Sequence, residues 1–197
     1  MGRGGLKSPN PRKQKGAVSL KLNFGNQRSH IDIQNSTLSE ITNQFSIEVM
    51  PRTADKVDDF RAILPKGTFI YIAHLEGTPI KSMVETADVL HKSEFNIVPH
   101  FPARLISDYK MLEDWLRQYS DVGITKGLVI AGSPLKATGE FESSMDLLST
   151  ELFNKYNFTE IFCAGHPEGN KDIDAKGSDH NLMNALKWKK KFFDQTN

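Results

Sequence analysis

The chain has 197 residues, of which 38% are hydrophobic and 25% are charged, a composition typical of a soluble globular protein. No apolar run reaches the ~18 residues that a membrane-spanning helix needs, which argues against an integral membrane protein. The single cysteine, Cys163, excludes an internal disulfide and predicts a reducing compartment such as the cytoplasm.

Charge is distributed unevenly along the chain. Residues 1–30 hold seven Lys and Arg and no Asp or Glu, so within a net charge of +1 the other residues sum to −6. This segment is rich in Gly and Pro and has no apolar periodicity, so we predict a disordered basic tail. Such a tail is either a solvated extension or the result of an upstream mis-start. It lacks the apolar core of a secretory signal; a nucleic-acid-binding or organelle-targeting arm stays an alternative. Residues 31–197 are not basic, so neither nucleic acid nor a membrane is an expected partner.

After the tail, short apolar strands alternate with amphipathic helices. Strands are predicted at residues 45–51, 68–75, 95–101, 127–132 and 160–167. A helix is predicted after each strand: from Thr53 with the apolar stripe Val57, Phe60, Ile63 and Leu64, from Pro79, from near Ser107, through Met145 to Tyr156, and from near Ser178.

This alternation predicts a parallel sheet covered by helices, in an α/β fold. Two architectures fit, a (β/α)8 TIM barrel and an open doubly wound sheet. A doubly wound sheet usually has a glycine-rich turn after its first strand, and residues 50–56 contain no glycine. We therefore favour the TIM barrel. About five βα units are visible instead of eight, so we expect an incomplete, C-terminally truncated barrel whose exposed edges favour aggregation or a homo-oligomer.

Unusual polar residues collect where the predicted strands end. Glu48 lies inside the first strand, although glutamate is poor strand material and is rarely buried without a partner. His74, His100, Ser133 and His166 end or follow the later strands. Because ligands bind at the carboxyl ends of parallel strands, these side chains are expected at one rim of the sheet.

Three functions fit this rim. A metal-dependent hydrolase would use His74, His100 and His166 as ligands, although no close His-x-His pair accompanies them. A cofactor enzyme would use Glu48 as a proton donor, and small strand-end residues would admit a flat ring system: Ala73, Ala131, Gly132, Ala164 and Gly165. The third alternative is an inactive barrel fragment that acts as a binding module.

Four motifs, taken in order, resemble the methylenetetrahydrofolate reductases. The stretch "EVMPR" (48–52) is similar to the family's E-F-F-P-P-R, and "PHF" (99–101) to its P-H-L. "GITKGLVIAGSP" (123–134) resembles the fourth strand with its glycine turn, and "AGHPEGN" (164–170) resembles A-G-Y-P-E-G-H. The resemblance runs from about residue 45 to residue 190.

This resemblance implies a TIM barrel that holds FAD and reduces 5,10-methylenetetrahydrofolate to 5-methyltetrahydrofolate. The hydride would come ultimately from NADH or NADPH, a choice that stays open. Glu48 would be the general acid, held protonated in a poorly hydrated rim. The resemblance places the flavin against His100, Ala131, Gly132, Ser133, Ala164, His166 and Asn170, with Lys189 or Lys187 at its phosphates, and no metal is expected.

Several positions depart from the family pattern. Ala131-Gly132-Ser133 stands where R-G-D is usual, so the aspartate beside the flavin and substrate is absent. Ala73 replaces a threonine, His166 and Phe141 replace tyrosines, and Asn170 replaces a histidine. These changes predict a divergent member in which flavin tuning and folate binding differ from those of the family.

Overall fold

The computed structural model describes residues 45–174 and 178–196, so the predicted basic tail at residues 1–30 lies outside the described part. In chain order the elements are β1 (Ser46–Val49), α2 (Pro51–Ala54), the 3-10 turn η1 (Phe60–Ala62), β2 (Phe69–Ile72), α3 (Ile80–Lys92), β3 (Asn96–Pro102), the 3-10 turn η2 (Ala103–Leu105), α4 (Tyr109–Asp121), β4 (Lys126–Ile130), α5 (Ser144–Ser149), α6 (Leu152–Lys155), β5 (Glu160–Cys163) and α7 (His180–Thr196).

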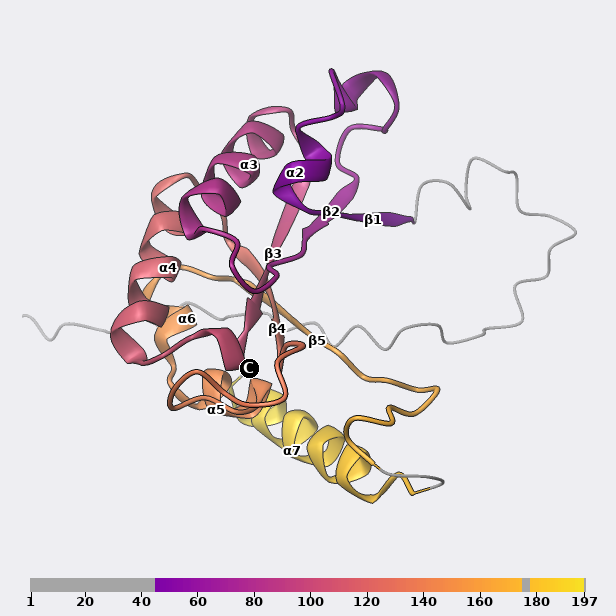
Figure 1. Ribbon diagram of the computed structural model, residues 1–197, viewed down its shortest axis with the longest axis vertical. Helices are drawn as coiled ribbons and strands as arrows, with labels where there is room; N and C mark the ends of the chain where they lie inside the picture. The colour runs from indigo at the N-terminus through magenta and orange to yellow at the C-terminus, as the bar shows by residue number, and fades with distance from the viewer. Residues whose placement is uncertain (1–44, 175–177, 197) are drawn as a thin grey trace, which may run out of the picture.

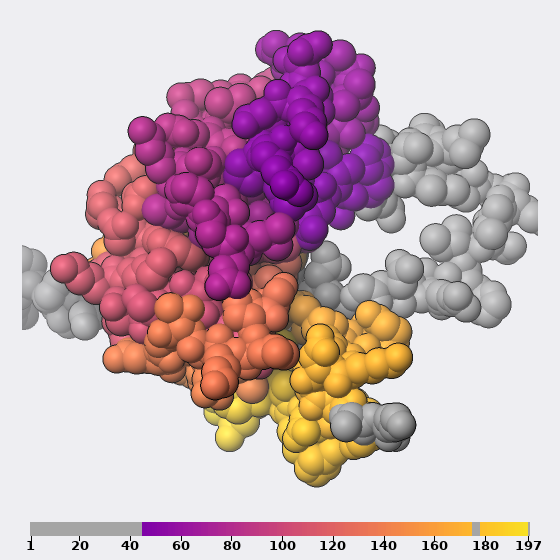
Figure 2. Space-filling model, viewed as in Figure 1, coloured from indigo at the N-terminus to yellow at the C-terminus, as the bar shows by residue number. Residues whose placement is uncertain are grey.

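The five strands form one parallel sheet in the order β1-β2-β3-β4-β5, which is also their order in the chain. All five predicted strands are confirmed, with ends that differ by a few residues. Helices flank the sheet, and α2, α3, α4 and α6 lie along the same side of it (Figure 1). The first unit and the last helix lie at opposite ends of the molecule (Figure 2). The predicted mixed α/β class with a parallel sheet is therefore confirmed.

One face of the sheet, here called the helix-covered face, builds the main core. Alternate strand residues point toward the helices, and Ile70, Ile72, Phe101 and Val129 are completely buried there. Phe101 makes edge contacts with the rings of Tyr119, Phe153 and Phe158, whose centroids lie 5.5, 5.1 and 5.5 Å away. Burial of these apolar side chains against the helices stabilises a sheet whose strands are short.

The opposite face, here called the concave face, carries Glu48, Phe69, Tyr71, His100 and Phe162. The Phe162 ring of β5 lies 6.2 Å from Phe69 and 6.0 Å from Tyr71, both on β2. Strands β3 and β4 separate β2 from β5, so a flat sheet would hold these backbones about 14 Å apart. The ring contacts fit a curved sheet with the aromatic side chains on its inner surface.

Two predicted helices differ from the observed ones. The stripe Val57 to Leu64 does not form one helix, because Pro51 starts the short α2 and Asp59 caps the separate turn η1 by accepting a hydrogen bond from the Arg61 amide at 2.9 Å. The single helix expected through Met145 to Tyr156 is divided into α5 and α6 at Glu151, whose φ of 57° is left-handed.

Among residues 45–174 and 178–196, no helix combines the length and the apolar character that crossing a bilayer demands.

Candidate functional site

Glu48 and His100 meet on the concave face. In the strand register Glu48 lies beside Tyr71, and Tyr71 lies beside Val98, two residues before His100. The Oε2 atom of Glu48 lies 3.5 Å from Nε2 of His100, and the ring of Tyr71 lies edge-on to the imidazole at 6.2 Å. Residues from the first and third strands are thus brought together as the shared rim predicts.

The two members of this pair differ sharply in exposure. The His100 side chain is 8% exposed, whereas that of Glu48 is 62% exposed. Burial, together with the neighbouring His74, lowers the pKa of His100 to about 4. His100 is therefore neutral at pH 7, and the pair is not a salt bridge at that pH. The exposure of Glu48 differs from the poorly hydrated rim that we expected, because β1 lies at the edge of the sheet.

His74 occupies a buried position at the end of β2. Its Nε2 atom lies 2.9 Å from the carbonyl oxygen of Thr78 and donates to it, and its ring stacks on Trp115 with centroids 4.5 Å apart. Burial lowers the pKa of His74, and the Thr78 carbonyl partly opposes this shift. The Nδ1 atom of His74 and the Nε2 atom of His100 are buried without a hydrogen-bond partner. Unsatisfied buried nitrogens of this kind are uncommon and call for an explanation, such as a bound water, ion or polar ligand.

Ala131, Gly132 and Ser133, predicted at the end of the fourth strand, lie in the loop that follows β4. Gly132 has a φ of +93°, and a Cβ atom built on it would lie 2.9 Å from Cβ of Pro102. Glycine is therefore needed at this position for two separate reasons, its left-handed backbone and the closeness of Pro102. Ala131 and Gly132 are half-buried, and Ser133 is exposed.

Ala164, His166 and Asn170 lie in the segment that follows β5. Ala164 and His166 are half-buried, and His166 has a left-handed φ of 48°. The amide of Gly169 donates to the His166 carbonyl at 2.9 Å and closes a turn. The Asn170 side-chain oxygen accepts a hydrogen bond from the Asp172 amide at 2.9 Å, so it stabilises this loop locally.

Lys189 lies on the buried side of α7. Its Nζ atom donates to the carbonyl oxygen of Ala164 at 3.0 Å, and only 7% of the residue is exposed. Burial lowers the pKa of Lys189, while the nearby Cys163 opposes the shift. The predicted role at the FAD phosphates fits poorly with this buried position. Lys187, the alternative, is exposed.

The metal-site alternative receives no support from the described residues. Among residues 45–174 and 178–196, no group of three His, Cys, Asp or Glu side chains is arranged to hold a metal ion. His74, His100 and His166 come from three different strand ends, and the structure does not gather them into one ligand set.

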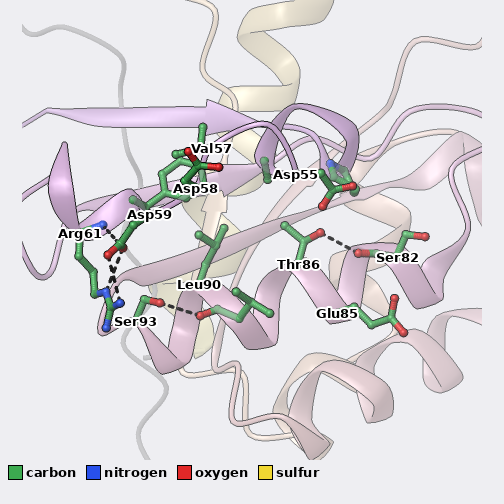
Figure 3. Close-up of a pocket in the computed structure, with 14 residues that line it drawn as sticks. Asp55, Val57, Asp58, Asp59, Arg61, Ser82, Glu85, Thr86, Leu90 and Ser93 are labelled. Carbon is green, nitrogen blue, oxygen red and sulfur yellow. Dashed lines mark hydrogen bonds and ion pairs between the residues drawn. The ribbon is translucent and has the colours of Figure 1, made fainter.

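A cavity of about 500 Å³ lies elsewhere, between α2, η1 and α3 (Figure 3). Its apolar wall includes Phe60 and Leu90. The hydroxyl of Thr86 donates to the Ser82 carbonyl within α3, and Asp59 is paired with Arg61. None of the predicted strand-end site residues lines this cavity.

Sequence reasoning missed three residues that shape the rim. Tyr71 and Phe162 fill the concave face between Glu48 and the last strand. Asp174 accepts hydrogen bonds from the amides of Asn181 at 3.0 Å and Leu182 at 2.8 Å, which anchors the start of α7 after the β5 loop. The alternation of residues along β2 and β5 was a usable signal for the two aromatic rings, whereas no local pattern indicates the role of Asp174.

No known protein-family model matches the chain.

Proposed function

We propose that this chain carries the flavin-binding part of a reductase that acts on a folate-type one-carbon carrier, with Glu48 as general acid. The observation that carries the proposal is the Glu48–His100 pair, whose facing atoms lie 3.5 Å apart at the carboxyl ends of strands β1 and β3. The four motifs that resemble the methylenetetrahydrofolate reductases include both residues, and the resemblance implies a general acid and a flavin contact at these positions.

The strand arrangement supports a barrel as the parent architecture. A doubly wound sheet reverses its strand order near the middle, whereas the five strands here are sequential. The contact between Phe69 and Phe162 across two intervening strands supports this proposal, because strands that close into a barrel form a curved sheet. We therefore infer that β1 to β5 are consecutive strands of a (β/α)8 barrel, with the site at its carboxyl rim.

The residues present fit the ring end of a flavin. The buried Nε2 of His100, which faces Glu48 but makes no hydrogen bond, offers a polar contact, and Ala131 and Ala164 add little bulk to the rim. When bound there, FAD would supply the hydride that it receives from NADH or NADPH. The phosphate end fits less well at Lys189, so the exposed Lys187 is the better candidate for that contact.

Glu48 and His100 would have different roles: Glu48 would donate a proton, and His100 would stay neutral. Because its pKa is about 4, His100 stays neutral near pH 7 and leaves the adjacent carboxyl group as the acid. The exposure of Glu48 gives it access to protons from water. In the complex, bound ring systems would cover the carboxyl group, which would then donate its proton to a nitrogen of the bridged folate. Ser133 brings no negative charge to this rim, so the binding of the folate differs from the family pattern.

The test uses the full chain, mixed with FAD and separated from free flavin. We expect a yellow protein whose flavin absorption is bleached by NADH or NADPH and restored by methylenetetrahydrofolate. Glu48→Gln should retain the flavin and its bleaching but lose folate turnover by at least about a hundredfold, the usual contribution of a general acid. Glu76→Gln, a change at another exposed acid near the end of β2, is the matched control and should keep full turnover.

Two results would count against the proposal. Unchanged folate turnover in Glu48→Gln would remove this residue from the mechanism. A chain that retains no flavin at all would leave the binding-module alternative.

A further inference from the structure

The loop that follows β4, residues 131–143, is held tightly against η2. Arg104, the middle residue of η2, is bonded to this loop from both its backbone and its side chain. Its amide donates to the Ala131 carbonyl at 2.9 Å, and its own carbonyl accepts from the amide and hydroxyl of Thr138 at 2.9 and 2.8 Å. Its guanidinium donates to the carbonyls of Pro134 at 3.0 Å and Glu142 at 3.1 Å.

Close packing supports the same attachment. The Glu140 amide donates to the Ser107 carbonyl at 3.0 Å. A Cβ atom built on Gly139 would lie 1.8 Å from that same carbonyl oxygen, so only glycine allows this approach. Further along the loop, Phe141 is 2% exposed and its ring lies 5.2 Å from that of Tyr109. The loop thus contacts the η2 segment and the beginning of α4 at several points.

The guanidinium of Arg104 bonds to backbone carbonyls, those of Pro134 and Glu142. Among the described residues no ion pair joins it to an acid. The planar group reaches two carbonyls that lie eight residues apart in the chain, Pro134 and Glu142, and a lysine ammonium could not span both with the same geometry. The side chain therefore fixes the loop near each of its ends.

We infer that Arg104 is a positioning residue of the candidate site, which holds Gly132 and Ser133 at the rim beside the ligand. This inference rests on the proposed function, since Gly132 and Ser133 belong to the expected flavin contact. Arg104 itself acts through the loop: its guanidinium holds Pro134, the residue after Ser133, and Glu142, while its backbone amide bonds to Ala131 at the exit of β4 whatever the side chain. A loop restrained in this way loses little conformational entropy when a ligand binds.

The first test compares Arg104→Lys with Arg117→Lys, which changes an exposed arginine on α4 paired with Asp114 and Asp121. Two measurements are made on each full-length variant, the dissociation constant for FAD and the midpoint of urea unfolding. We expect Arg104→Lys to raise the FAD dissociation constant about tenfold, as the loss of one or two hydrogen bonds would. Its urea midpoint should stay near that of the unchanged protein, and Arg117→Lys should alter neither quantity.

Hydrogen exchange supplies a readout that does not depend on flavin. In Arg104→Lys the amides of residues 131–143 should exchange faster, while those of α3 should not change. Thr138→Val is the second variant, because it removes one hydroxyl bond to Arg104 and leaves the guanidinium intact. It should weaken FAD binding by about threefold and increase exchange in the same loop.

The outcomes separate the two proposals. If the unchanged protein binds FAD and Arg104→Lys binds it equally well, the positioning role is wrong and the proposed function stands. Weaker binding without faster exchange in residues 131–143 would also overturn the positioning role. If the unchanged protein binds no FAD, the proposed function fails and the positioning role fails with it.

Discussion

The two faces of the sheet are built from alternate residues of the same strands, yet they differ in almost every property. On the helix-covered face, Ile70, Ile72 and Phe101 are completely buried among apolar neighbours. The concave face carries aromatic rings together with Glu48, His100 and the ion pair between Lys126 and Glu160. Because a strand separates its odd and even positions, one face can stabilise the fold while the other holds polar groups for chemistry.

The largest expected loss of stability comes from a substitution in the helix-covered face. Phe101→Ala removes a completely buried ring that contacts three other aromatic rings, and it should lower the free energy of unfolding by about 3–5 kcal/mol. Phe69→Ala, on the concave face, removes a half-buried ring and should cost only about 1–2 kcal/mol. Urea unfolding of both variants measures the difference. Equal losses would show that the two faces are packed alike.

The second prediction concerns the charge state of the concave face. The pKa of His100 is about 4 in the folded protein, against an ordinary value of about 6.5 in an unfolded chain. Between these values the unfolded state binds the proton and the folded state does not, so stability is lost as the pH falls from about 6.5 to about 4. The loss from this residue amounts to roughly 3 kcal/mol.

Urea unfolding at several pH values measures this dependence. His100→Gln should be less dependent on pH over that window, with the remainder coming from His74, whose pKa is also lowered. His91→Gln, a change at an exposed histidine of α3, retains both buried imidazoles and should behave as the unchanged protein does. A His100→Gln variant with the full original dependence would contradict the burial of His100 in solution.

A smaller loss of stability is expected at the strand-end rim, where both faces of the sheet end. Gly132→Ala places a Cβ atom 2.9 Å from Pro102 in a residue with a φ of +93°, and it should cost about 2 kcal/mol. Gly77→Ala is the control, because its φ of +78° is also left-handed but no atom lies within 4 Å of the added carbon. Thermal unfolding should show the larger loss for Gly132→Ala. The reverse order would mean that the β4 exit is looser than described.

The smallest effect is expected at the amino end of the concave face. Lys126 and Glu160 form an ion pair between β4 and β5, with side chains that are 18% and 19% exposed. Lys126→Met should lower the free energy of unfolding by about 1 kcal/mol at pH 7. A double-mutant cycle with Glu160→Gln isolates the pair from the other contacts of each residue. A coupling energy of zero would show that the pair adds nothing to this face.

The sequence predicted the strands well because each is short, apolar and followed by a turn or a helix start. It predicted the first helix poorly. The stripe from Val57 to Leu64 has helical spacing, but Asp59 turns its side chain back to cap the next turn, and Ile63 is 63% exposed. A residue that competes for backbone hydrogen bonds can end a helix that apolar periodicity alone would continue.

The candidate site could be predicted in part. The proximity of Glu48 and His100 follows from strand alternation and from the common rim of a parallel sheet. The exposure of Glu48 was missed, although the expected incomplete barrel has exposed edges and β1 is the edge strand of this sheet. The burial of Lys189 had a signal that was not used, since Leu182, Lys189 and Phe193 recur at helical spacing and share the buried side of α7.

The left-handed turn at His166 limits which residue types can occupy the exit of β5. With a φ of 48°, this position accepts glycine, asparagine, aspartate or histidine at little cost, whereas bulkier side chains are strained there. A bulky side chain such as tyrosine would therefore require a different path of the chain between Ala164 and Gly169. Exchange of this one side chain would change the backbone as well, so the imidazole and the shape of its turn depend on each other.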